Sequence, residues 1–189
     1  MHILCDTCSI LMLLRIAPNM FTDERYRCAT VRQVWEEFTQ TQKFKTKYPW
    51  RKEYAKHIRS TPVNKITTPE YDLTLRAARL TEQTQRNSRT GRAFGLSRCD
   101  IEIAACAITL GYLISSTDAN LVDFLKQQYD VKNVLPLQLV NDWLENELLE
   151  WTESRQGVLI DWIACGEPRQ SRREIKRFEK LTGKRYPAG

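Results

Sequence analysis

Three aspartates stand where the chain is expected to enter a helix. Asp6 follows the short apolar run 2–5, Asp118 follows the run 112–115, and Asp100 lies three residues after Ser97, which is expected to open a helix. In an open parallel sheet the carboxyl ends of the strands face one crevice, so Asp6 and Asp118 meet there if their strands are neighbours. Asp100 can join them from its helix N-terminus, and the spacing therefore predicts a carboxylate cluster at a sheet edge.

A fourth acid could come from Glu36 or Glu37, within a segment that is expected to be helical. An apolar stripe at helical spacing marks the buried face of that helix: Val31, Val34, Trp35 and Phe38. At 100° per residue, Glu37 lies about 110° from the centre of this face and Glu36 about 150° from it. A residue on the flank can reach a crevice at the domain edge, which favours Glu37.

Four carboxylates in one cleft repel each other unless some are protonated or a hard cation lies among them. Oxygen ligands without His or Cys select Mg²⁺ or Mn²⁺, which would polarise a phosphate and lower the pKa of a bound water. The alternative for each aspartate is an ordinary helix cap, with Asp100 completing a capping box with Ser97. For each aspartate taken singly, a helix cap is at least as good an explanation as a functional site. The occurrence of four such acids together favours a site.

The segments that carry these acids resemble the four motifs of the PIN-domain nucleases, and among them the VapC-like toxin ribonucleases. Residues 3–9 resemble the opening strand, the first Asp and the hydroxyl residue after it. Residues 34–38 resemble the second motif, a Glu before an apolar residue, and residues 97–104 the third, an Asp before an Ile/Ala-rich helix. Residues 113–121 resemble the fourth, an apolar strand and a hydroxyl residue two positions before Asp. The resemblance covers roughly residues 1–150.

The resemblance implies a PIN-like three-layer α/β/α domain with a central, mainly parallel sheet and a Mg²⁺ or Mn²⁺ site. It implies hydrolysis of RNA phosphodiester bonds, as the toxin or effector of a toxin–antitoxin or defence system. A homodimer and an inhibitory antitoxin partner are further implications. On this basis the catalytic and metal-binding residues are Asp6, Glu37, Asp100 and Asp118, and the supporting residues are Thr7, Ser9, Ser116 and Asn120.

Two positions depart from the family pattern. Cys8 stands where the family often has Ser or Asn, and Asn120 stands where a further acid often lies, which leaves a second metal ion open. Asp123 or Glu102 could substitute for that acid. Two alternatives therefore stay open, a PIN-fold module that binds nucleic acid or a partner with little or no catalysis, and a nuclease acting on DNA. A haloacid-dehalogenase-type phosphatase is set aside, because it needs an Asp at position 8.

Short apolar runs alternate with helical patterns, which predicts an α/β domain with a parallel sheet. The expected strands are 2–5, 28–30, 112–115 and 131–135. The expected helices are 7–16, 31–44, 50–59, 69–86, 97–110, 119–129 and 137–151, with a polar loop over 87–95. After about residue 150 the pattern is helical only. We therefore expect a nuclease domain over 1–150 and a basic helical C-terminal extension over 151–189, through which a protein partner could bind.

The 189-residue chain carries a net charge of +6, although residues 100–154 hold ten acids against two lysines. Basic residues interleave with aromatic ones over 43–52, as single-stranded RNA contact would require, and arginines lead into Asp100. The residues predicted to bind RNA are Lys43, Lys45, Lys47, Trp50, Arg51, Arg89, Arg92 and Arg98. The alternative for 43–52 is a solvated connection with Tyr48 and Trp50 buried, and for the basic tail a solvated helix.

No stretch is long and apolar enough to span a membrane. The N-terminal segment lacks a basic leader and carries Asp6 inside its apolar run, so a cytoplasmic protein is expected. The six cysteines show no second pair at zinc-finger spacing and are expected to be reduced thiols.

Overall fold

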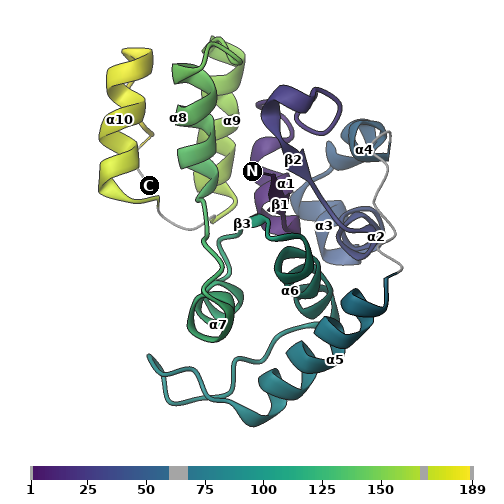
Figure 1. Ribbon diagram of the computed structural model, residues 1–189. Helices are drawn as coiled ribbons and strands as arrows, with labels where there is room; N and C mark the ends of the chain where they lie inside the picture. The colour runs from purple at the N-terminus through teal and green to yellow at the C-terminus, as the bar shows by residue number, and fades with distance from the viewer. Residues whose placement is uncertain (1, 60–67, 167–169, 188–189) are drawn as a thin grey trace.

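The computed structural model describes residues 2–59, 68–166 and 170–187 of the chain. It is a mixed α/β structure, mostly helical, built on one small parallel sheet (Figure 1). The strands are β1 (Ile3–Cys5), β2 (Cys28–Ala29) and β3 (Leu113–Ser115), in the order β2-β1-β3. Because β1 is central, it pairs with a strand close in sequence and with another more than 100 residues away. The α/β class and the parallel sheet are confirmed.

Helices occupy most of the remaining described chain. Before the third strand they are α1 (Thr7–Leu13), α2 (Arg32–Gln40), α3 (Gln42–Lys47), α4 (Arg51–Arg59), α5 (Pro69–Thr84) and α6 (Arg98–Leu110), with a 3₁₀ turn over Glu24–Tyr26. After it they are α7 (Ala119–Tyr129), α8 (Pro136–Glu145), α9 (Glu153–Ala164) and α10 (Arg172–Thr182). Several expected helices are shorter or divided. The helix expected over 7–16 ends at Leu13, and the helix expected over 69–86 ends at Thr84. The segment 31–44 breaks at Thr41, whose backbone is extended, and 137–151 ends at Glu145, shortly before Glu147 turns left-handed.

The strand expected over 131–135 is wrong. In its place a single parallel bridge joins Asn133 to Ile114, with Val134 N donating to Ile114 O at 2.8 Å. The Asn133 side chain then bonds both the backbone N–H and the carbonyl of Ser116. Pro136 begins α8 directly afterwards, which leaves no room for further strand pairing. The segment still stabilises this edge of the sheet, because its hydrogen bonds hold the loop that follows β3.

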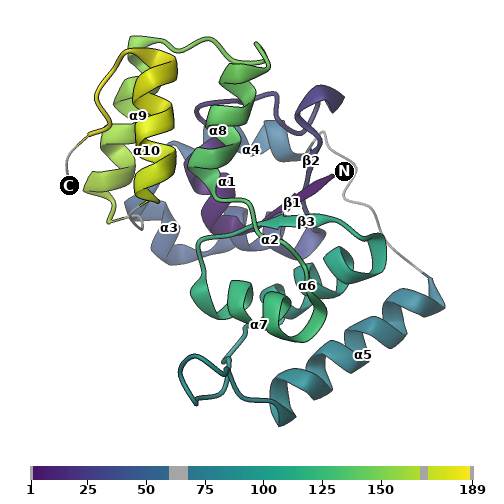
Figure 2. The same ribbon diagram turned by 60° about the vertical axis from the view of Figure 1, so that its left-hand side comes forward.

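One hydrophobic core joins the sheet to helices from both ends of the chain. Phe38, Phe94 and Phe124 are fully buried in it, and Trp162 of α9 and Phe178 of α10 belong to the same cluster. Figures 1 and 2 show α8, α9 and α10 on one side of the sheet and α5 on the opposite side, packed along α6. Among the described residues, no helix is long and apolar enough to cross a membrane.

Candidate functional site: a pocket of four carboxylates

The loops that follow β1 and β3 lie side by side, as the sequence predicts for neighbouring parallel strands. Cys5 pairs with Ser115, and the next backbone N–H, that of Asp6, donates to Ser115 O at 3.1 Å. The Ser116 hydroxyl then donates to Asp6 Oδ2, and the Asp118 N–H donates to Ser116 Oγ at 3.0 Å. The Ser116 hydroxyl therefore links the Asp6 carboxylate to the backbone of Asp118.

Asp6 caps α1 and is nearly enclosed by protein. Its side chain is 5% exposed, and Oδ1 accepts from Ser9 N at 2.7 Å. Burial raises the pKa of Asp6 to about 6, with the nearby charge of Asp100 adding to the rise, although hydrogen bonds from Ser116 and Ser9 oppose it. A cap alone does not require such burial, because helix N-termini at a surface are capped by exposed aspartates.

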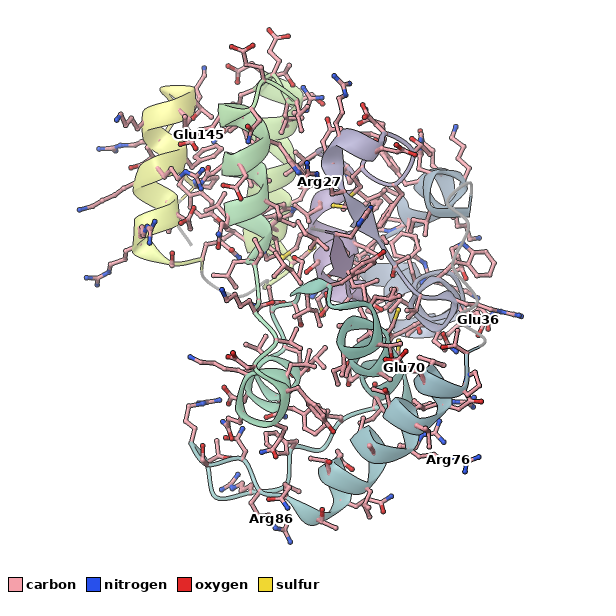
Figure 3. All side chains as sticks on the ribbon, viewed as in Figure 1. Arg27, Glu36, Glu70, Arg76, Arg86 and Glu145 are labelled. Carbon is pink, nitrogen blue, oxygen red and sulfur yellow. The ribbon has the colours of Figure 1, made fainter. Side chains whose placement is uncertain are left out.

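Glu37 enters the site from α2 and is held by Thr7, whose hydroxyl donates to Glu37 Oε2. Its neighbour Glu36 is directed elsewhere. Glu36 Oε1 accepts from Arg32 Nε at 2.7 Å, one turn earlier in the helix, and Figure 3 shows Glu36 at the outer surface. The structure therefore places Glu37 at the site and Glu36 outside it.

Asp100 reaches the site from the first turn of α6. It forms the predicted capping box, since Asp100 Oδ2 accepts from Ser97 N at 2.8 Å and Asp100 N donates to Ser97 Oγ at 3.1 Å. Burial raises the pKa of Asp100, and the charges of Asp118 and Glu37 raise it further against the hydrogen bonds from Ser97. The residue is thus both a cap and a member of the carboxylate cluster.

Asp118 completes the set at the N-terminus of α7. Its Oδ1 accepts from Asn120 N at 2.8 Å and from Leu121 N at 3.1 Å, and the residue is exposed. Asn120 contributes this backbone N–H and is exposed. Ser9, by contrast, is buried, and its hydroxyl accepts from Ser115 Oγ at 3.1 Å. Ser9 and Asn120 thus hold their acids through local backbone N–H groups, whereas Thr7 and Ser116 hold theirs through hydroxyls from distant parts of the chain.

The four acids line one pocket of about 410 Å³. Its other lining residues are Thr7, Cys8, Leu11, Val34, Phe44, Lys47, Tyr48, Ser97, Cys99 and Ile103. Among the described side chains, the lining thus combines four carboxylates with one lysine, on walls that are partly apolar. Sequence reasoning missed Cys8 and Cys99 as lining residues, although each stands next to a motif position. Burial, together with the charges of Glu37 and Asp100, raises the pKa of the Cys99 thiol well above its usual range.

The chemistry of the pocket suits a hard divalent cation. Its acids come from four separate elements, offer only oxygen, and include two carboxyl groups whose pKa is raised partly by the other acids. Within residues 2–59, 68–166 and 170–187, however, no group of three or more His, Cys, Asp and Glu side chains is arranged to hold a metal ion. The carboxylate oxygens thus suit the ion by their chemical type, although the acids do not form a ready ligand shell. Water molecules would have to complete the coordination, and Mg²⁺ usually keeps several waters.

The two acids considered as substitutes for an additional ligand lie outside the pocket lining. Glu102 is buried against α5, where it accepts from Tyr71 Oη and from Arg79 Nη2 at 3.2 Å. Asp123 Oδ2 accepts from Asn87 Nδ2 at 2.9 Å and from Arg89 Nε at 2.8 Å. Both therefore serve contacts between helices and loops.

The basic and aromatic segment 43–52 is divided between packing and exposure. Arg51 is 1% exposed and donates from Nη1 to Phe38 O at 2.6 Å, so it does not offer a phosphate contact. Trp50 is partly buried against the core, where its ring lies 6.1 Å from that of the buried Tyr48. Lys45 and Lys47 are exposed. The side chain of Lys43 lies outside the described residues.

The three predicted arginines that precede Asp100 in the sequence are all exposed. Arg89 pairs with Asp123 at 2.8 Å, Arg92 lies in the loop before α6, and Arg98 is the first residue of α6. The Arg98 side chain is 82% exposed and lies 3.9 Å from Glu102. Of the eight residues predicted to bind RNA, Lys47 lines the carboxylate pocket and Arg98 lies beside it.

No family model, curated protein or solved structure matches this chain.

Proposed function

We propose that this protein is a Mg²⁺- or Mn²⁺-dependent endoribonuclease of the PIN class, with its active site in the carboxylate pocket. One observation carries the proposal. Asp6, Glu37, Asp100 and Asp118, which lie on four elements spread over more than 100 residues, line the same pocket at the carboxyl edge of a parallel sheet. Ligands of open α/β sheets bind at this edge. Capping alone explains three of these acids singly, and it explains neither Glu37 nor their convergence.

In this proposal the four carboxylates hold the ion, directly or through water. The ion would supply positive charge to the scissile phosphodiester and acidify a water for its hydrolysis. Thr7 fixes the Glu37 carboxylate, and Ser116 fixes the Asp6 carboxylate. Lys47 lines the same pocket, and its charge would offset part of the repulsion between the acids and the polyanion. Leu11, Val34 and Ile103 limit the access of bulk water on the apolar walls.

The wider features implied by the family belong to the same proposal. They are the three-layer PIN architecture, a role as toxin or effector in a toxin–antitoxin or defence system, a homodimer, and a cytoplasmic location. The extension 151–189 is proposed as the docking site of an antitoxin or another protein. Within it, α10 presents an exposed basic face that includes Arg172, Arg173, Lys176 and Lys180. Such a face suits an acidic partner.

The second candidate is a module of the same fold that binds nucleic acid or a partner without turnover. Two observations favour it: Asn120 in place of a further acid, and carboxylates that are not arranged as a ready ligand shell in the described part of the chain. A nuclease acting on DNA is the third, since the 2′-hydroxyl is not needed for hydrolysis by an activated water.

Cleavage of labelled single-stranded RNA and DNA, with Mg²⁺ and with EDTA, separates these candidates. The wild type is expected to cut RNA only with the metal, and Asp100→Asn is expected to lose that activity. Asp72→Asn, an exposed acid in the first turn of α5, is the matched control and keeps the wild-type rate. Equal cleavage by wild type and Asp100→Asn would show that the site assignment is wrong. RNA binding without turnover supports the second candidate, and cleavage of DNA alone supports the third.

A further inference from the structure

A second depression adjoins the carboxylate pocket between α2 and α6. It has a volume of about 420 Å³ and is lined by Arg32, Gln33, Glu36, Arg98 and Cys99. Cys99 lines the carboxylate pocket as well, so the two depressions share a wall. We call this second depression the α2–α6 groove. The groove and the carboxylate pocket therefore lie next to each other at Cys99.

The charge of the groove is opposite to that of the pocket. Two guanidinium groups, from Arg32 and Arg98, stand against the single carboxylate of Glu36. Arg32 is paired with Glu36 at 2.7 Å, yet its side chain remains 62% exposed. Arg98 Nε lies 3.9 Å from Glu102 Oε1, and Glu102 also accepts from Tyr71 and Arg79. The Arg98 side chain is 82% exposed, and this long contact leaves its guanidinium free to bond a ligand in the groove.

We propose that the α2–α6 groove is a phosphate subsite for the nucleotide that adjoins the scissile bond, with Arg98 as its principal contact and Arg32 as its second. The proposal rests on the proposed nuclease function for the identity of the strand. Arginine suits this role because its planar fork bonds two phosphate oxygens and stays charged at every physiological pH. A pocket with four acids repels a polyanion, so a positive subsite next to it is what holds the strand in place.

Binding of a fluorescent single-stranded 12-nucleotide RNA, and of a DNA with the same sequence, tests the groove without turnover. The titrations are followed by anisotropy in EDTA, which prevents metal-dependent cleavage. Arg98→Ala is expected to raise Kd about three- to tenfold and Arg32→Ala about two- to fivefold. Arg98→Ala should also reduce the slope of log K against log salt by about 0.7, the value for one phosphate contact on a single strand.

Two further variants make the test specific. Glu36→Gln removes the competing carboxylate and is expected to lower Kd about two- to threefold, the direction opposite to that of the arginine variants. Arg76→Ala, an exposed cation on α5 that points away from the body in Figure 3, is the control for net charge and should leave Kd within about 1.5-fold. Thermal melts check that each variant is folded.

The outcomes separate the groove from the proposed function. The groove assignment is overturned if the wild type binds neither strand, or if Arg98→Ala and Arg32→Ala behave like Arg76→Ala. It is also overturned if Glu36→Gln weakens binding. Arginine-dependent binding by a wild type that cuts no nucleic acid with Mg²⁺ would instead overturn the proposed function and leave the groove assigned. Equal losses for RNA and DNA indicate contact with the phosphate alone.

Discussion

Two clusters of acids in this molecule have opposite electrostatic settings. In the carboxylate pocket, the described lining holds four acids and one cation, Lys47. Between α8 and α10, the carboxylates of Asp142, Glu145 and Glu174 surround one guanidinium, that of Arg177, which bonds all three. Hydrogen bonds and ion pairs with these acids raise the pKa of Arg177, and the pKa of Glu145 falls in return. We call this second set the Arg177 cluster.

The difference separates acids that the fold explains from acids for which we propose a function. The Arg177 cluster carries its own counter-charge and connects two helices, so its acids are explained by the fold. In the carboxylate pocket the pKa values of Asp6 and Asp100 rise, because burial and neighbouring acids disfavour their charged forms. Buried acids with raised pKa values destabilise the fold when they are charged, and they are typical of sites that bind cations or catalyse reactions.

The largest expected contrast between the two clusters is in nuclease activity. Asp118→Asn keeps the shape of the side chain and removes a ligand, so we expect cleavage of RNA to fall by at least about 100-fold, since changing residues that only orient metal ligands already costs up to about 100-fold. Glu145→Gln in the Arg177 cluster should leave the rate within about twofold. Initial rates with saturating Mg²⁺ measure both. Equal losses in the two variants would remove the distinction.

The second contrast is in how stability depends on pH. The pKa of Asp6 is about 6 in the folded chain, against 3.8 for an aspartate free in water, so the folded state holds more protons between these values. Stability from this group is therefore present at low pH and is lost as the pH rises from about 4 to 7, by at most about 3 kcal/mol. Asp6→Asn should remove this loss. Urea unfolding in EDTA across this range measures it, and parallel pH curves for wild type and variant would contradict it.

The third contrast is the stability supplied by the Arg177 cluster. Arg177→Met leaves three carboxylates without their shared cation, and the buried Glu174 loses one of its partners. We expect the free energy of unfolding to fall by about 1–2 kcal/mol, while cleavage by the folded fraction is unchanged. Lys180→Met, an exposed cation on the same helix, should change it by less than about 0.5 kcal/mol. Equal effects of the two variants in urea unfolding would show that the cluster stabilises nothing.

The smallest contrast is the response to metal. Mg²⁺ at several times its dissociation constant should stabilise the wild type by about 1 kcal/mol, which corresponds to a rise in Tm of about 2–4 °C. Arg177→Met should show the same rise, and Asp100→Asn should not. Thermal melts with Mg²⁺ and with EDTA measure the shift. A rise of the same size in Asp100→Asn would place the ion outside the pocket.

The placement of the acids could be predicted from sequence because local rules fix it. Asp6 and Asp118 are N-caps and Asp100 completes a capping box with Ser97, and such capping patterns can be recognised in a short segment of sequence. Glu37 was separable from Glu36 because the helical angle decides which side chain flanks the buried face. The neighbouring strands that bring Asp6 close to the loop of Asp118 followed from the general geometry of parallel sheets.

The features that sequence missed depend on packing between distant segments. Val131, Val134 and Leu135 have strand-like composition, and a single bridge at Asn133 is all that forms there. Arg51 stands in a basic segment suited to RNA, yet its side chain is buried. Its guanidinium donates a hydrogen bond to the backbone carbonyl of Phe38 on α2. The missing strand and the burial of Arg51 cannot be predicted from local periodicity, since each depends on which distant element packs against the segment.

The central position of β1 has a consequence during synthesis. Residues 28–29 leave the ribosome soon after β1 and can pair with it at once, whereas its other partner, β3, is made more than 80 residues later. Until then one edge of β1 is open, and the Asp6 carboxylate lacks the hydroxyl of Ser116. The pocket therefore cannot be assembled on a nascent chain that ends before residue 116. If the protein cleaves RNA, this order of assembly delays its activity until most of the domain has been translated.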